Sequence, residues 1–226
     1  MKRSEINQAI NQAIWFFKKR GFFLPPFAYW SPYEWQEKNH LRDEIKKTRL
    51  GWDVTDFGLG DFKHFGRIIF TLRNGHPHLK QYPKTYCQKV MFLKEDQKSP
   101  IHYHKNKMED IINAGGGNIM IRLWTIDENK SLSKKSLTVK IDSQERKING
   151  GQAVCLAPGQ SICVTPLTYH QFWAQKNLGL TLSMEISSVN NDTKDNFWLK
   201  PAKRFPKIEE DEARHYLLCS EYESFL

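Results

Sequence analysis

The stretch that decides the fold and the chemistry of this chain is residues 100–117, PIHYHKNKMEDIINAGGG. Two histidines, His102 and His104, stand two residues apart, and on a β-strand this spacing puts both imidazoles on the same face. Glu109 comes five residues after His104, which is the wrong parity for one continuous strand. We therefore predict a bend at residues 105–108, after which a second strand returns the carboxylate toward the histidines, and the closing glycines permit a tight reversal.

Short apolar or alternating segments on both sides of this stretch predict a domain built from β-strands. RIIFTLRNG, YCQKVMFLK and NIMIRLWTID are examples, and each is bounded by turn signals. Runs this short and this regularly punctuated indicate an antiparallel β-sandwich or barrel. We expect a single domain over residues 1–226, with a helical N-terminal extension (1–65), a barrel core (66–190) and a C-terminal wrap (191–226).

Helices are expected only in the two extensions. Residues 4–20 carry apolar side chains at three- and four-residue spacing, and Ser4 is placed to cap that helix. The sequence SPYE is a capping box with proline at the first helical position, so a second helix should run from Pro32 to about Lys47. A third should begin near Pro206, where the following acidic run EEDE would lie at its positive end.

The composition is that of a globular protein. The 226 residues include 26% charged and 13% aromatic side chains, and the net charge is +9. The basic residues occur in short pairs and never in a long run, which favours a basic surface over nucleic-acid binding. No segment is long and apolar enough for a membrane span or a signal peptide, and the four cysteines form no CxxC pair. We expect a cytoplasmic protein without a nucleic-acid or membrane partner.

A further histidine would complete a metal site with the opening stretch, and His170 in TYHQFWA is the candidate. A lone HxH pair is common on solvated strands, and the second one in this chain, NGHPH at 74–78, lies in a turn without a suitably spaced carboxylate. We interpret that second pair as a loop. Imidazoles from His102, His104 and His170 with the Glu109 carboxylate suit Mn²⁺, Fe²⁺, Co²⁺, Ni²⁺ or Zn²⁺, and leave coordination positions open for a substrate.

The spacing of these residues also resembles a known pattern. HxH, four residues, Glu, six residues, Gly is the first metal-binding motif of the cupin family, and a PG turn followed by His170 resembles the second motif. Asp96 stands where cupins usually carry a glycine, and Ala174 where they often carry an asparagine. The resemblance implies a cupin barrel around one metal ion. The first motif consists here of His102, His104, Glu109 and Gly116.

A more specific resemblance covers residues 51–212. The strings GWDVTDFG, FTLRNG, HYHKNKMEDIINAGGG, LAPGQSI, YHQFWA, EISSVNND, DNFW and RFPKIEEDE resemble the D-lyxose isomerase family, in the same order. This resemblance implies an enzyme that interconverts aldoses and ketoses through an enediolate: D-lyxose with D-xylulose, and D-mannose with D-fructose. It also implies a divalent metal ion, usually Mn²⁺, and a homodimer.

Isomerisation of a sugar needs a base for the carbon proton and an acid for the oxygens. In LGLTLSMEISS, Glu185 alternates onto a face of small hydroxyls, which lies either inside the barrel or in solvent, and the resemblance places it inside. Lys107, in the predicted bend, is expected to stabilise the enediolate or carry a proton, and Lys89 is a second lysine of this kind. Asp195 and Arg204 match the DN and RF strings of the family and are expected to bind sugar hydroxyls or order the site.

Other classes of function stay open at this point. A cupin Fe²⁺ oxygenase would need an apolar pocket, whereas the candidate residues are polar. A non-catalytic cupin would bind a sugar or a partner through the same barrel. A phosphosugar isomerase would need a phosphate cradle, but no glycine-rich loop precedes a helix, and we identify no Arg/Lys triplet that would form one. An unphosphorylated monosaccharide is therefore the expected substrate.

Overall fold

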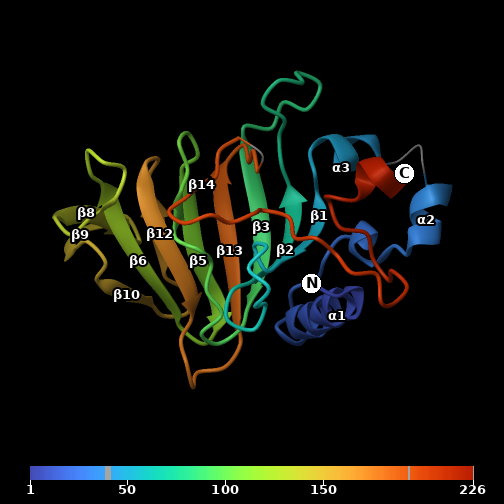
Figure 1. Cartoon of the computed structure of the whole chain (residues 1–226), viewed down its shortest axis with the longest axis horizontal. Helices are drawn as coiled ribbons and strands as arrows, with labels where there is room; N and C mark the ends of the chain where they lie inside the picture. Colours follow the sequence, from blue (N-terminus) through green and yellow to red (C-terminus); the bar gives the residue numbers. More distant parts are fainter. Residues whose placement is uncertain (39–41, 193, 226) are drawn as a thin grey trace.

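The computed structural model describes residues 1–38, 42–192 and 194–225, and consists of two antiparallel sheets that face each other (Figure 1). In the larger sheet the strand order is β1-β2-β3-β13-β5-β11-β8-β9, and in the smaller one it is β10-β6-β12-β4-β14, with β7 beside β6. The larger sheet contains β1 (Gly51–Thr55), β2 (Arg67–Arg73), β3 (Tyr86–Leu93), β13 (Thr181–Ser188), β5 (Glu109–Gly116), β11 (Ser161–Val164), β8 (Ser136–Ile141) and β9 (Gln144–Asn149). The smaller contains β10 (Ala153–Leu156), β6 (Ile119–Ile126), β12 (Thr168–Ala174), β4 (His102–Tyr103), β14 (Phe197–Trp198) and β7 (Leu132–Ser133).

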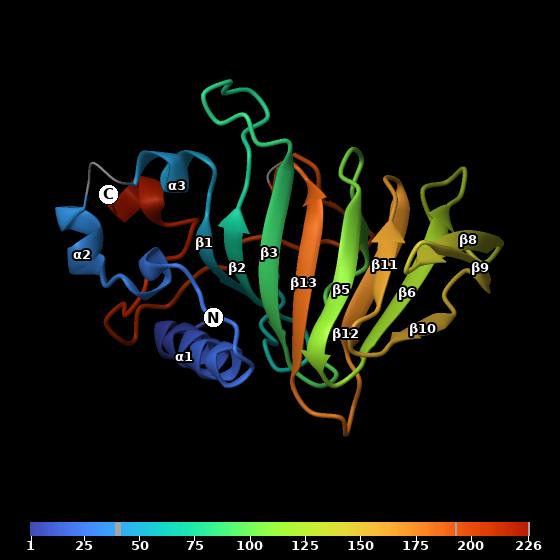
Figure 2. The ribbon, with the colours of Figure 1, turned by 180° about the vertical axis from the view of Figure 1, so that it is seen from behind.

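The larger sheet is covered on both faces where it borders the N-terminal region. Along β2, Ile69 belongs to the core between the two sheets, while Ile68 and Phe70 belong to a second core that includes the apolar face of α1 (Arg3–Lys19). Alternating side chains of one strand therefore enter two different cores, which is why three consecutive residues of β2, Ile68 to Phe70, are apolar. Figure 2 shows α1 beside this end of the larger sheet, with β8 and β9 at the opposite end.

The remaining helices are short and lie toward the two ends of the chain. They are η1 (Pro26–Tyr29), α2 (Pro32–Glu37), α3 (Asp43–Lys47) and α4 (Tyr222–Phe225). The capping box is present, since Ser31 and Glu34 bond reciprocally at the start of α2. The single helix predicted from Pro32 to Lys47 crosses residues 39–41, which lie outside the described residues, and α2 and α3 stand on either side of them. No helix among the described residues has both the length and the apolarity to cross a membrane.

Two predictions about the helices are wrong, and one contact explains both. Ser4 does not cap α1, which is preceded by Lys2, and no helix begins near Pro206. Instead, the Asp211 carboxylate accepts hydrogen bonds from the Ser4 backbone N–H (2.9 Å) and from the Ser4 hydroxyl (2.7 Å). The acidic run therefore lies at the positive end of α1, where a carboxylate is favourable, and not at the start of a helix of its own.

The fold class is confirmed as an antiparallel β-barrel of the cupin type with its helices toward the termini. One strand, β1, lies within the region predicted as a helical extension and pairs along its full length with β2. The glycine run closes β5 as expected: at Gly116, φ is +100°, and a Cβ would come 2.2 Å from the Leu180 carbonyl oxygen. Asp96, in place of the usual cupin glycine, still has a φ of +54°.

Candidate metal and catalytic site

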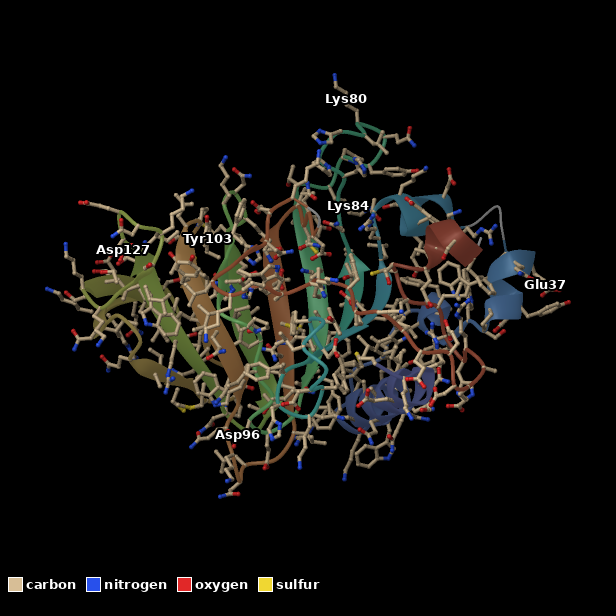
Figure 3. The ribbon with its side chains drawn as sticks, viewed as in Figure 1. Glu37, Lys80, Lys84, Asp96, Tyr103 and Asp127 are labelled. Carbon is tan, nitrogen blue, oxygen red and sulfur yellow. The ribbon has the colours of Figure 1, made fainter. Side chains whose placement is uncertain are left out.

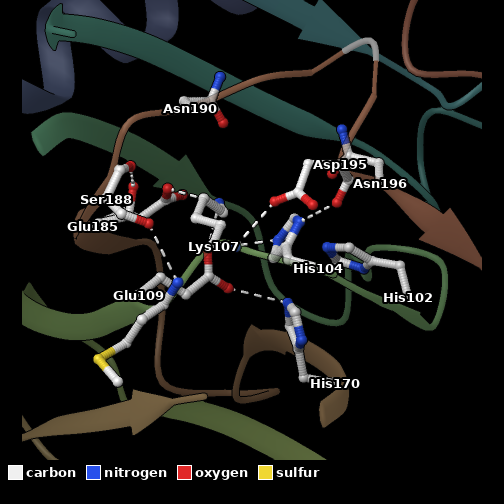
Figure 4. A network of polar contacts seen from close by, with 12 residues as sticks. His102, His104, Lys107, Glu109, His170, Glu185, Ser188, Asn190, Asp195 and Asn196 are labelled. Carbon is white, nitrogen blue, oxygen red and sulfur yellow. Dashed lines mark hydrogen bonds and ion pairs between the residues drawn. The ribbon is translucent and has the colours of Figure 1, made fainter. Parts of the chain in front are cut away.

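Three buried histidines converge between the two sheets. His102 on β4 lies directly opposite His170 on β12 in the antiparallel pairing, and His104 follows β4 immediately. One ligand nitrogen from each of the three lies within 4.8 Å of the others. Figure 4 shows the three rings turned toward the same space. The parity argument thus brought together His102 and His104, although β4 itself is only two residues long.

Each histidine uses its Nδ1 atom in the same way. Nδ1 lies 2.9 Å from the Pro100 carbonyl oxygen in His102, 2.9 Å from the Asp195 carbonyl oxygen in His104, and 3.1 Å from the Thr168 carbonyl oxygen in His170. A carbonyl only accepts, so Nδ1 carries the ring proton and Nε2 keeps a lone pair. Carbonyl partners of this kind orient the histidine ligands of metal ions in proteins.

The charge state of the rings also fits a divalent cation. Burial, with the neighbouring His170 and His104, lowers the pKa of His102 well below its ordinary value, and burial with Lys107 lowers the pKa of His104 to about 3. Both rings are therefore neutral at neutral pH. Nε2 of His170 is buried and makes no hydrogen bond with any residue that the structure describes, although Oε1 of Glu109 lies 3.0 Å away. Buried lone pairs without donors are what a metal ion satisfies, so the three histidines could bind one.

Glu109 opens β5 after the predicted bend and turns back to this cluster. Its carboxylate lies 3.0 Å from Nε2 of His170, 3.6 Å from Nε2 of His104 and 2.5 Å from Nζ of Lys107. Burial raises its pKa, but the charges of Lys107 and His104 outweigh this effect and the net pKa is well below normal. The structure thus brings all four predicted ligands together and sets Lys107 beside them.

Glu185 faces inward from β13 and forms the centre of a buried charge network with two lysines. Its Oε1 atom lies 3.1 Å from Nζ of Lys89, its cross-strand partner on β3, and 2.9 Å from Nζ of Lys107. Burial raises the pKa of Glu185, but the two lysines outweigh it and the net pKa is lowered. Burial lowers the pKa of Lys107, yet Glu109 and Glu185 more than offset this, and the net pKa is raised. The carboxylate is therefore ionised and the ammonium protonated at neutral pH.

Asp195 is close to the site but does not line its cavity. Its Oδ1 accepts the backbone N–H groups of Lys105 and Asn106 at 3.0 Å each, and its Oδ2 accepts the N–H of Lys107 at 2.9 Å. Its carbonyl oxygen receives the ring N–H of His104. This one residue therefore shapes the bend that carries Lys107 and also orients a candidate metal ligand, which is a positioning role.

Replacing Asp195 with alanine is expected to weaken metal binding by about tenfold, because alanine keeps the backbone carbonyl that accepts from His104 but removes the carboxylate that fixes this segment against the bend. The bend between β4 and β5 would lose four charge-assisted hydrogen bonds, three from backbone N–H groups and one from the Asn106 side chain, so His104 and Lys107 would be held less firmly. The dissociation constant is measured by competition with a chelating dye. Asp110→Ala is the control, because Asp110 is adjacent to Glu109 and exposed. Equal affinities in the two variants would contradict the positioning role.

Another part of the cavity wall contains a cation, the guanidinium of an arginine, between two carboxylates. Arg204 forms an ion pair with Asp53 on β1 and another with Asp192, whose Oδ1 lies 3.1 Å from Nε of Arg204. Nη1 of Arg204 is buried and has no hydrogen-bond partner among the described residues. Of these three only Arg204 was predicted. Asp53 and Asp192 lie in strings that carry the family resemblance, GWDVTDFG and EISSVNND, but no local pattern pairs residues so far apart.

Aromatic side chains add one apolar surface to the site. Trp198 on β14 lines the cavity and packs on the His102 ring at a centroid distance of 4.9 Å. The three other tryptophans that lie on strands do not line the cavity, and Trp52 belongs to the core beneath α1. Arg67 also lines the cavity, although no sequence pattern pointed to it. Among the described residues its guanidinium donates hydrogen bonds only to backbone carbonyls. Those three other tryptophans are Trp52, Trp124 and Trp173.

Known proteins resemble this chain in sequence and in fold. A family model described as D-lyxose isomerase matches residues 1–222. A D-lyxose/D-mannose isomerase from Serratia proteamaculans is 44% identical, and one from Escherichia coli O157:H7 is 43% identical, each over 100% of both chains. Among solved structures, the L-ribose isomerase of Cellulomonas parahominis with L-ribose has a TM-score of 0.58 at 13% identity, covering 92% of this chain and 98% of that one. That structural likeness concerns the fold alone.

Proposed function

This chain belongs to the D-lyxose isomerase family, and we propose that it interconverts D-lyxose with D-xylulose and D-mannose with D-fructose. The observation that carries the proposal is that three buried histidines, a carboxylate base and a protonated lysine meet in one cavity. Relatives at 43–44% identity over the full chain bear the name of this activity. An aldose–ketose isomerase needs these groups and no redox cofactor.

We place one divalent metal ion on His102, His104, His170 and Glu109, with Mn²⁺ as the expected species and Zn²⁺, Fe²⁺, Co²⁺ and Ni²⁺ as ions that the same ligands accept. When bound, it would polarise the carbonyl of the sugar and stabilise negative charge on the neighbouring oxygens. The inference depends on the carbonyl partners of the three Nδ1 atoms, which leave three buried lone pairs directed at one space.

The proton transfers are assigned by charge. Glu185, held ionised by two lysines, takes the proton from C2 of the aldose and returns it to C1 of the ketose. Lys107, held protonated by two carboxylates, donates a proton to O1 as negative charge develops there, and its amine takes up the proton that O2 loses when C2 becomes the ketose carbonyl. The raised pKa of Lys107 argues against a role as the base. Arg204 and Lys89 are proposed to bind the sugar hydroxyls, with Asp195 acting through the bend.

The substrate class, oligomeric state and location of the enzyme are proposed on the same basis. We expect an unphosphorylated monosaccharide as substrate, because Asp53 and Asp192 already pair with Arg204, which leaves that guanidinium without free charge for a phosphate. We also expect a homodimer, as the family resemblance implies, and a cytoplasmic location, which the cysteine pattern favours. Nucleic acid and membranes are not expected partners.

The test is an anaerobic screen of aldoses with metal-stripped protein, to which Mn²⁺ is added back. Ketose should form from D-lyxose and D-mannose only after the metal is restored, and mannose 6-phosphate should be a much poorer substrate than mannose. Formation without any added metal, in the presence of a chelator, would refute the metal-dependent chemistry. If no aldose gives ketose under any condition, the proposed function is wrong.

A further inference from the structure

A second hollow lies beside the catalytic cavity and has a different chemistry. It encloses about 190 Å³, against about 50 Å³ for the catalytic cavity, and it contains none of the candidate metal ligands. It is formed by the end of α3, by the start of the loop between β2 and β3, and by the segment after β13. That loop rises above the sheet, with Lys80 near its tip (Figure 3). The ionisable residues in the wall of the hollow are Lys47, Arg49, His76, His78, Asp192 and Lys194.

The wall of this hollow carries uncompensated positive charge. Lys47, Arg49 and Lys194 make no ion pair within the described part of the chain, and the aromatic ring of Phe205, 6.0 Å from the Arg49 guanidinium, carries no charge. Asp192 is the one carboxylate among the described lining residues, and it is already engaged by Arg204 on the far side. Cations that converge without counter-charges attract an anion.

The turn at residues 74–78 contributes donors to the same place. Nδ1 of His76 accepts the backbone N–H of His78 at 3.1 Å and that of Leu79 at 3.0 Å, so the ring proton is on Nε2. The second HxH pair of the sequence therefore has no metal-binding arrangement. It forms instead a donor-bearing rim beside Lys47 and Arg49, and an arginine with adjacent ammonium and imidazole donors suits the several oxygens of a phosphate group.

The hollow shares a wall with the catalytic cavity. Oδ1 of Asn190 accepts a hydrogen bond from Nζ of Lys89 at 2.9 Å, and Asp192 binds Arg204. Lys89 in turn contacts Glu185. An anion in the hollow would therefore lie against the same short segment that holds two cations of the catalytic cavity, while remaining outside that cavity.

We infer that the hollow between α3, the turn at 74–78 and the segment after β13 is a binding site for a phosphate group, either inorganic phosphate or the phosphate of a small sugar ester. The fold brings Lys194 next to Lys47 and Arg49, which lie about 145 residues earlier in the sequence. This site is independent of the proposed isomerase reaction, because none of its basic residues lines the catalytic cavity.

The test is calorimetric titration of the full-length protein with inorganic phosphate and, separately, with mannose 6-phosphate, at constant ionic strength. Both should bind with similar affinity if the phosphate group is what the hollow recognises. Lys47→Gln and Arg49→Gln should each weaken binding by about tenfold, since each removes one charge-assisted contact. Arg49→Lys, which keeps the charge, should restore part of it.

Lys46→Gln is the matched control, because Lys46 is the neighbouring residue of α3 but does not line the hollow. It removes the same charge and should leave the affinity unchanged. Equal weakening by Lys46→Gln would show a general effect of charge and overturn the site. So would unaltered affinity in Arg49→Gln, no binding of phosphate in the millimolar range, or binding of mannose 6-phosphate without binding of phosphate. The measurement does not depend on turnover, so a failed isomerase assay would not affect it.

Discussion

Replacing Glu185 with glutamine is expected to lower kcat by about 10²–10⁴-fold, the range typical for loss of a general acid–base group. Glutamine has nearly the same size and can still accept hydrogen bonds from Lys89 and Lys107, but it cannot take up a carbon proton. The metal should remain bound, because Glu185 is not one of the four proposed ligands and its carboxylate contacts Lys89 and Lys107 instead. The variant therefore separates the chemistry of the proton from the binding of the metal.

The measurement that isolates this step is incorporation of solvent deuterium into the sugar by NMR, together with kcat. Glu145→Gln is the control, since Glu145 is exposed on β9 far from the cavity in sequence and fold. The lowered pKa of Glu185 keeps its carboxylate ionised down to pH values below about 4.3, the ordinary value for glutamate, so loss of activity above that pH must have another cause. Exchange at the wild-type rate in Glu185→Gln would assign the base elsewhere.

The metal half of the site could be predicted because its information is local. His102, His104 and Glu109 lie within eight residues, and the parity of β-strands fixes which side chains share a face. The break in parity correctly predicted a bend between β4 and β5, and with it the place of Lys107. Glu185 shows the limit of this reasoning, because alternation defines two faces but not which of them is covered. Packing against the second sheet decides that.

The residues that were missed depend on contacts between distant segments. Asp53 on β1 and Asp192 after β13 meet only through Arg204 in the C-terminal segment. The basic hollow has a similar origin, because the fold brings Lys47 and Arg49, at and just after the end of α3, next to Lys194 in a much later segment. The acidic residues near 210 were predicted to begin a helix, but they stabilise α1 at the other end of the chain. The prediction that these carboxylates lie at the N-terminus of a helix was correct, but the helix is α1 and not one formed by their own segment.

Replacing His170 with glutamine is expected to weaken metal binding by more than about 100-fold, since loss of a ligand exceeds the effect of losing an outer partner. His170 is completely buried, and its Nε2 is the one lone pair in the cluster that lies at hydrogen-bonding distance from Glu109 yet is unsatisfied. Glutamine fills much of the ring volume, so the barrel should stay folded. Turnover should fall with metal occupancy and return in part when Mn²⁺ is in large excess.

His64→Ala is the matched control, because the His64 side chain is 62% exposed and pairs with Asp61 outside the cavity. Metal content and kcat are measured on the same samples, so that occupancy and activity can be plotted against each other. A linear relation through the origin is expected if every turnover needs the metal. If His170→Gln binds metal normally, His170 is not a ligand. If it loses the metal but keeps its activity, the lone pairs between the sheets serve structure alone, and the reaction must be carried by Glu185 and Lys107 without a Lewis acid.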